Sequence, residues 1–273
     1  MGNGVPGGLR ARRARMLATM VGLTAAVAAM CGPATVAAAT TAAATAVAGP
    51  AVSDPMSALE EPGATVVLSD EKRVSRWAHA NETYPIRTAP KTAARTITRL
   101  RFATEDKYPE VYLVLDGKLD EHGDPWLRIR VPMRPNGRVG WVPAEMLSQL
   151  YVVRTQLVID RAAKRAKLFK NGRKIWEASV GIGKSGTPTP RGSFWVREKL
   201  KGFGGSYGPW AFGTSAYSSI SDWPNGGVVG IHGTNEPGLI PGTPSHGCVR
   251  VRNDKITQLS RLMPIGTPVR IVR

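Results

Sequence analysis

The chain of 273 residues has two cysteines, Cys31 and Cys248, and this scarcity limits how it can be held together. Cys31 lies in an N-terminal segment with the features of a removable export signal. Without that segment the chain keeps one thiol, so no internal disulfide constrains its fold. An unpaired thiol in an exported chain is either a reactive group or half of an intermolecular bond.

Residues 1–48 predict a signal peptide. Four arginines precede an apolar run from Met16 to Met30, and Ala46-Val47-Ala48 is a small-x-small cleavage site. The strongly apolar part is short for a bilayer span, which disfavours the alternative of an uncleaved membrane anchor. Lipid attachment at Cys31 is disfavoured because Met30 stands where a small residue is expected. We therefore expect a protein secreted to the cell envelope.

The chain is strongly basic, with a formal net charge of +17. Loss of the four arginines in residues 1–48 lowers the charge to +13, because that segment contains no acid. Excess positive charge suits polyanionic surroundings, and nucleic acid is the usual partner. Export and the lack of a nucleic-acid-binding motif exclude that partner. The carboxylates and phosphates of a cell wall are the polyanions that fit better.

Residues 49–81 are rich in Pro, Ala, Ser and Glu and predict a linker, with a short strand at Thr65–Leu68. A first block of short strands at 82–148 predicts a small barrel or sandwich. Its motifs Tyr84-Pro85-Ile86-Arg87, Trp126-Leu127-Arg128-Ile129 and Gly140-Trp141-Val142 resemble those of bacterial SH3-like domains. The resemblance implies a wall-binding or spacing module. The alternative is a barrel that only packs against its neighbour.

The second block, residues 154–273, is also mainly β. Asn171-Gly172 predicts a hairpin turn, because both residues tolerate positive φ. Val228–His232 predicts a buried strand that delivers His232 at its end. One helix is expected, capped by Asn253 or Asp254, with an apolar face and a stop at Pro264. The apolar face consists of Ile256, Leu259 and Met263.

Cys248 ends the run Ser245-His246-Gly247-Cys248 and has the surroundings that a thiolate nucleophile needs. His232, sixteen positions upstream, can act as general base and then general acid. Gly247 removes side-chain bulk beside the sulfur and lets backbone N–H groups reach a developing oxyanion.

Other interpretations of these residues are weaker. A buried cysteine and hydrogen-bonded histidines with purely structural roles are each common. Cys248, His232 and His246 could supply three zinc ligands, but the regular spacing of zinc sites is missing. The convergence of the one remaining thiol with two of the four histidines in a glycine-rich context favours catalysis. We predict neither a metal nor a cofactor.

Two motifs identify the family that the second block resembles. Ile231-His232-Gly233-Thr234-Asn235 and Ser245-His246-Gly247-Cys248-Val249-Arg250 closely resemble the L,D-transpeptidase catalytic domain of the YkuD type. The segment from Gly183 to Phe194, with Thr187-Pro188-Thr189-Pro190, adds to the match. The resemblance implies a β-sandwich with one or more short helices, acting on peptidoglycan stem peptides.

The resemblance also implies roles for individual residues. Cys248 is expected to be the nucleophile and His232 its proton acceptor and donor. The Gly233 carbonyl would orient His232, while His246, Gly247 and the Cys248 N–H would shape the oxyanion pocket. Ser245 and Arg250 are expected to bind substrate, Arg250 through a carboxylate, although it could equally be a solvated surface arginine.

The expected reaction is a two-step acyl transfer. Cys248 attacks the bond between the diamino acid of a tetrapeptide stem and its terminal D-alanine, forms a thioester, and passes the acyl group to an amine of a neighbouring stem. Carbapenems are expected to acylate the same thiol. Two alternatives remain open: an L,D-carboxypeptidase that uses water as the acceptor, and a non-catalytic wall-binding protein.

Overall fold

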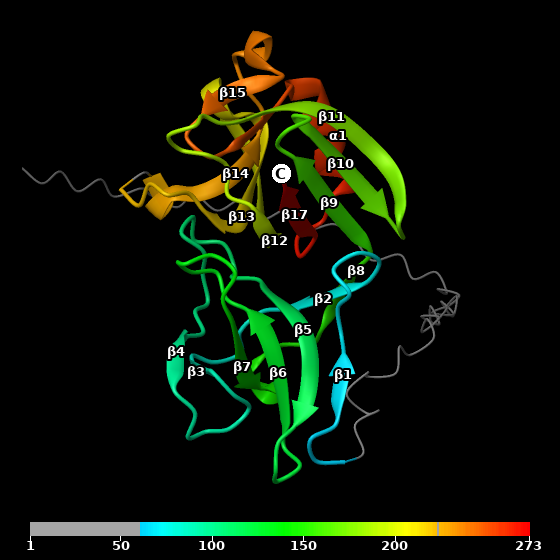
Figure 1. The fold of residues 1–273 in the computed structure, drawn as a ribbon, viewed down its shortest axis with the longest axis vertical. Coiled ribbons are helices and arrows are strands. Elements are labelled where there is room, and N and C mark those ends of the chain that lie inside the picture. Colours follow the sequence, from blue (N-terminus) through cyan, green and yellow to red (C-terminus); the bar gives the residue numbers. More distant parts are fainter. Residues whose placement is uncertain (1–60, 223) are drawn as a thin grey trace, which may run out of the picture. The chain divides into compact units, whose positions relative to one another are not determined.

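The computed structural model describes residues 61–222 and 224–273. The predicted signal peptide, with Cys31, lies outside these residues. The described chain consists of two β-sheets, one α-helix and short 3-10 turns (Figure 1). The prediction of a mainly β fold with a helix is therefore confirmed. No helix in the described part of the chain is long and apolar enough to span a membrane.

The first sheet has eight strands, and its pairings are antiparallel. Its central strand is β5 (Tyr112–Leu119), which pairs on one side with β6 and on the other with β1 and β2. Across the sheet the order is β4 (Thr96–Arg99), β3 (Pro85–Arg87), β7 (Val139–Pro143), β6 (Pro125–Arg130), β5, β2 (Ser75–Ala78) and β8 (Tyr151–Val153), with β1 (Thr65–Val67) beside β5.

Two of these strands lie in the segment predicted as a linker. β1 is the short strand expected there, but β2 contradicts the linker prediction, because it pairs with both β5 and β8 and Trp77 is buried. The four residues of β2 are too few to show a clear alternation. Their partner strands also lie more than 30 residues further along the chain, where local patterns give no signal. The SH3-like character of this sheet stays a prediction.

The second sheet has nine strands among the described residues and closes on itself. Because β10 pairs with both β9 and β11, eight strands form a ring, and β15 lies outside it beside β11. The order is β10 (Arg165–Lys170), β9 (Thr155–Asp160), β17 (Pro268–Val272), β12 (Gly192–Gly204), β13 (Gly208–Tyr217), β14 (Val228–His232), β16 (Val249–Val251), β11 (Arg173–Gly183) and β15 (Gly242–Ser245). The ring encloses the larger hydrophobic core.

The local predictions for this block are confirmed in three places. Asn171 and Gly172 have φ values of 51° and 78° and join β10 to β11 in a tight hairpin. Val228–His232 forms β14. The helix α1 (Asn253–Leu262) buries Ile256 and Leu259 in the core, with Met263 directly after it.

The predicted helix cap is wrong. Arg252 occupies the N-cap position, and no side chain caps the helix by a hydrogen bond. The Asn253 side chain binds another segment instead: its Oδ1 accepts a hydrogen bond of 2.9 Å from the Thr234 N–H. A residue with capping chemistry therefore holds the loop that follows His232.

Buried polar contacts join the first sheet to the long strand β12. Arg197 is 1% exposed, and its Nε donates to Glu110 Oε1 at 2.6 Å. Nearby, Trp195 Nε1 donates to the Val111 carbonyl at 2.7 Å. Trp195 also packs in one hydrophobic cluster with buried residues of the first sheet, so the two sheets share part of their buried surface.

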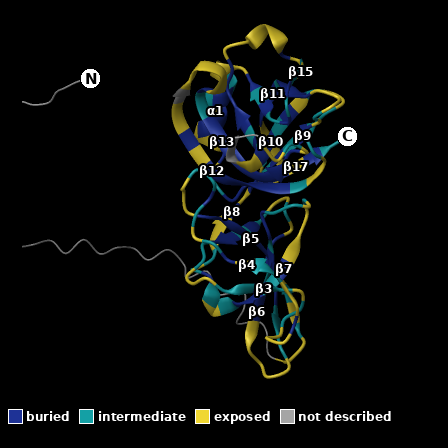
Figure 2. Cartoon of the chain, turned by 90° about the vertical axis from the view of Figure 1, so that its left-hand side faces the viewer, coloured by how far each residue is buried: buried dark blue, intermediate teal, exposed yellow. Residues whose placement is uncertain are grey.

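Buried residues concentrate in the strands, and exposed residues concentrate in the turns (Figure 2).

Candidate active site

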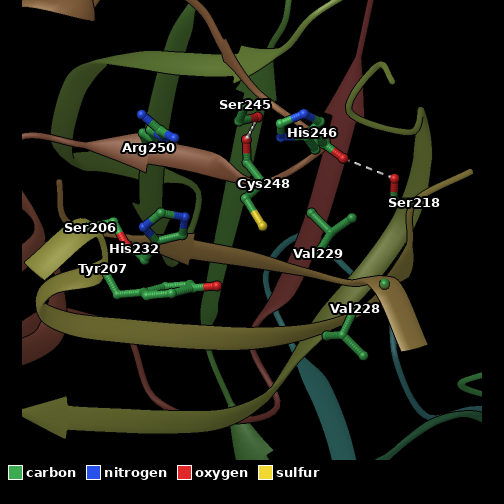
Figure 3. A pocket seen from close by; sticks show the side chains of 11 residues that line it. Ser206, Tyr207, Ser218, Val228, Val229, His232, Ser245, His246, Cys248 and Arg250 are labelled. Carbon is green, nitrogen blue, oxygen red and sulfur yellow. Dashed lines mark hydrogen bonds between the residues drawn. The ribbon is translucent and has the colours of Figure 1, made fainter. Parts of the chain in front are cut away.

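The parallel pairing of β14 with β16 brings His232 and Cys248 together. His232 is the last residue of β14 and pairs with Arg250 of β16. Cys248 directly precedes β16, so it lies beside β14, near His232. A Cβ on Gly230 would lie 3.7 Å from His232 Cδ2 and 3.9 Å from Cys248 Sγ. Both side chains therefore flank the same bare backbone position and line one pocket (Figure 3).

The imidazole of His232 is held in one orientation. Its Nδ1 lies 2.6 Å from the carbonyl oxygen of Gly233. A carbonyl can only accept, so Nδ1 carries the proton and Nε2 has the free lone pair. The loop is fixed in turn, because the Gly233 N–H donates to Trp210 O at 3.1 Å and Asn253 binds the next N–H. Gly233 thus lies where an orienting group for the base is required.

Burial keeps both reactive groups neutral. Desolvation, opposed by the hydrogen bond to Gly233 and assisted by the nearby charge of Arg250, lowers the pKa of His232 to about 4. Desolvation raises the pKa of the Cys248 thiol, although the Gly230 N–H, 3.4 Å from Sγ, and Arg250 both favour the thiolate. Both shifts favour a neutral thiol beside a neutral imidazole in the resting site, which agrees with the sequence-based expectation that His232 is the general base for Cys248. The thiolate would form as Nε2 takes the proton.

Ser245 and Gly247 close the turn that carries the nucleophile. The Ser245 hydroxyl donates to Cys248 O at 2.6 Å and accepts from the Gly247 N–H at 3.2 Å. Ser245 lines the pocket, but its hydroxyl is engaged within the loop, although the sequence predicted that it binds substrate. The Gly247 N–H is likewise directed to Ser245 rather than to an oxyanion. Gly247 has φ of +128°, a conformation that side chains rarely adopt.

His246 and Arg250 also line the pocket. The backbone carbonyl of His246 accepts a hydrogen bond from Ser218 Oγ at 3.0 Å. Arg250 Nη1 lies 2.6 Å from Glu236 Oε2, and the arginine side chain is 18% exposed against 51% for the glutamate. Arg250 is thus a largely buried cation at the pocket, which differs from the solvated arginine of the alternative interpretation.

Several residues of the site were not predicted from the sequence. Tyr207, in the turn between β12 and β13, has its ring centroid 4.7 Å from that of His232, and burial raises the pKa of its hydroxyl. Ser218 and Asn253 hold backbone groups of the two catalytic loops. None of the three has a local signal, since each lies far in sequence from the group that it contacts.

The zinc interpretation gains no geometric support. Within the described residues, no three side chains of His, Cys, Asp or Glu gather in a group that could hold a metal ion. The pocket itself has a cavity volume of about 120 Å³, and serine, histidine and aromatic side chains contribute to its lining. Its chemistry is that of a thiol with a neighbouring general base.

The neutral resting pair makes a prediction for the pH dependence of thiol alkylation. Iodoacetamide reacts with the thiolate, so its rate follows the thiolate fraction. Because the pKa of Cys248 is raised and that of His232 is lowered, the rate should rise in a single step above about pH 8.5. A rate plateau that begins between about pH 4 and 7 would indicate a thiolate–imidazolium pair and contradict this account.

Comparisons with known proteins agree on the second block. The family model of the YkuD L,D-transpeptidase catalytic domain matches residues 154–271. YkuD of Bacillus subtilis, which carries an L,D-transpeptidase name, is 30% identical over 123 residues, which are 45% of this chain and 69% of that protein. YqjB of the same organism, named likewise, is 32% identical over 122 residues, or 42% of this chain and 69% of that protein.

Solved structures give lower similarities. The catalytic domain of an Enterococcus faecium L,D-transpeptidase is 26% identical with a TM-score of 0.33, covering 43% of this chain and 96% of that chain. L,D-transpeptidase 3 of Mycobacterium tuberculosis, in complex with a faropenem-derived adduct, is 13% identical with a TM-score of 0.40, covering 71% and 98%. Family membership therefore rests on the sequence matches, and on these grounds the chain belongs to the L,D-transpeptidase family with a YkuD catalytic domain.

Proposed function

We propose that this protein is an exported peptidoglycan L,D-transpeptidase that cross-links stem peptides through a thioester on Cys248. The observation that carries the proposal is the placement of the Cys248 thiol in one pocket with the His232 imidazole, whose Nδ1 is bound to the Gly233 carbonyl so that Nε2 can accept a proton. Acyl transfer needs these two groups in one pocket, together with donors for an oxyanion.

In the first step the Cys248 sulfur attacks the carbonyl carbon of the diamino acid at its bond to the terminal D-alanine. His232 Nε2 takes the thiol proton as the carbon–sulfur bond forms, which gives a tetrahedral oxyanion. The carbon–nitrogen bond then breaks, and His232 gives the proton to the departing amine. The product is a thioester, with free D-alanine as the leaving group.

In the second step an amine of a neighbouring stem attacks the thioester carbonyl. His232 takes a proton from that amine and returns it to the departing sulfur. A peptide bond between two third-position residues forms, and the neutral thiol is restored. A covalent intermediate allows the first product to leave before the second substrate binds. The pKa of about 4 keeps His232 unprotonated at neutral pH, as both proton transfers to it require.

Three further features belong to the proposal. Export follows from the signal-peptide features of residues 1–48, and an unprocessed N terminus in the mature protein would contradict it. Cell-wall polyanions remain partners suggested by the charge. Carbapenems would acylate Cys248, because the carbonyl of a strained lactam can take the place of the scissile amide at the thiol.

Substitution of the reacting pair tests the reaction. Purified Cys248→Ala and His232→Ala should form no cross-linked dimer from a disaccharide-tetrapeptide, while their circular dichroism stays that of the wild type. The wild type should give dimer together with free D-alanine, measured by mass spectrometry. Tripeptide as the sole product would assign the protein as an L,D-carboxypeptidase, and no turnover by the wild type would favour a wall-binding role. Normal dimer yield from either variant would reject the mechanism.

Arg250 is proposed to bind a carboxylate of the donor stem. In the free enzyme its guanidinium pairs with Glu236 at the pocket, and a substrate carboxylate could replace that partly exposed side chain. Glu236 therefore holds Arg250 in place until substrate binds.

Kinetics on a matched pair of variants tests this role. Arg250→Ala should raise KM for the tetrapeptide about 10- to 100-fold, since a hydrogen bond to a charged group contributes about 1.5–3 kcal/mol. Arg252→Ala is the control, because Arg252 bonds to the Ile240 carbonyl and does not line the pocket. Its KM should stay within about twofold of wild type. Equal KM values for both variants would remove Arg250 from substrate binding.

A further inference from the structure

Three hydroxyl groups hold three consecutive carbonyls of the nucleophile loop. Ser218 Oγ donates to His246 O at 3.0 Å, Thr189 Oγ1 donates to Gly247 O at 2.8 Å, and Ser245 Oγ donates to Cys248 O at 2.6 Å. Each hydroxyl comes from a different part of the chain. The orientation of every peptide plane around the sulfur is therefore set by a side chain.

The bond from Thr189 fixes the direction of the Cys248 N–H. The Gly247 carbonyl and the Cys248 N–H belong to one peptide unit, and in a trans peptide the two point in opposite directions. Among the described residues, the cis peptide bonds are Arg134–Pro135 and Ile240–Pro241, so this unit is trans. The carbonyl points to Thr189 inside the protein, and the Cys248 N–H consequently points away from it.

Thr189 is itself rigidly placed. It is fully buried, and its Oγ1 accepts a hydrogen bond of 2.9 Å from the Gly183 N–H at the end of β11. The Thr189 hydroxyl thus accepts from the Gly183 N–H and donates its own proton to the Gly247 carbonyl. The Thr189 carbonyl accepts from Arg161 Nη1 at 2.7 Å. A Cβ on Gly183 would meet the Thr189 backbone nitrogen at 2.5 Å, so only glycine allows this approach.

We propose that Thr189 is a positioning residue for acyl transfer: its hydroxyl orients the 247–248 peptide so that the Cys248 N–H stabilises the oxyanion formed on the substrate carbonyl. The inference rests on the proposed function, because the oxyanion forms only in the proposed acyl transfer. Thr189 itself does not touch the substrate. The hydrogen bond from Thr189 is needed because position 247, with φ of +128°, is a glycine, and the backbone of glycine rotates more freely than that of any other residue. Without this hydrogen bond, the Cys248 N–H would point toward the oxyanion only part of the time.

Two reactions of the same thiol separate this role from a structural one. Acylation by p-nitrophenyl acetate passes through a tetrahedral oxyanion and releases p-nitrophenolate. Alkylation by iodoacetamide displaces iodide at a saturated carbon and forms no oxyanion. Both form a bond to Cys248 sulfur, so the ratio of their second-order rate constants reports the oxyanion donor. Unfolding would expose the thiol to both reagents, so it would not slow acylation alone.

Thr189→Val keeps the shape of the side chain and removes the donor. We expect the acylation-to-alkylation ratio to fall about 10- to 100-fold, somewhat less than complete loss of one oxyanion donor. Thr189→Ser should restore the ratio to within about threefold, because it retains the hydroxyl. Thr267→Val is the matched control, since Thr267 is also fully buried and donates to the Pro264 carbonyl at 2.7 Å. Its ratio should equal that of the wild type.

An unchanged ratio in Thr189→Val overturns the proposal, as does a parallel fall of both rates. If Thr189→Val does not fold, Thr189→Ala is compared with Thr189→Ser, and equal ratios overturn it. The small ester needs no recognition of a stem peptide. A wild type that is acylated by the ester but inactive on the disaccharide-tetrapeptide would therefore reject the proposed function, while the ratio still tests Thr189.

Discussion

The parallel pairing of β14 with β16 is the contact on which the site depends. These two strands lie within a closed ring of eight, so neither can slide without disturbing its neighbours. A shift of one residue in a strand moves every side chain to the opposite face. His232 ends one strand and Cys248 precedes the other, and the ring therefore fixes the distance between base and nucleophile.

Placement beside a buried strand also sets the electrostatics of the pair. The same desolvation lowers the pKa of His232 and raises that of Cys248, so both favour their uncharged forms. A preformed ion pair would be costly in such surroundings unless further hydrogen bonds satisfied it. In the proposed mechanism the proton moves when substrate is present, and the orientation of Nδ1 toward Gly233 leaves Nε2 to receive it.

The sequence predicted the parts of the fold and site that depend on local patterns. The turn at Asn171-Gly172, the strand ending at His232 and the apolar face of α1 each follow from a few neighbouring residues. The pairing of His232 with Cys248 was inferred from their residue types and glycine-rich context and was then supported by the motif match; no period in the sequence indicated it.

Contacts between distant segments could not be predicted. Asn253 has the chemistry of a helix cap, but its side chain binds the N–H of Thr234 in the loop after His232, 19 residues away in the sequence. β2 has too few residues to show a pattern, and its partners lie far along the sequence. The ion pair of Arg197 with Glu110 joins residues 87 positions apart. Opposite charge alone could not predict which of the chain's acidic residues Arg197 would contact.

The most direct test of the account is the identity of the covalent intermediate. Rapid acid quenching of the enzyme with a disaccharide-tetrapeptide, followed by peptide mapping in a mass spectrometer, measures which residue carries the acyl group. The account predicts a disaccharide-tripeptide joined to Cys248 as a thioester that hydroxylamine removes. Turnover without an adduct on Cys248, or with the adduct on another residue, would contradict it.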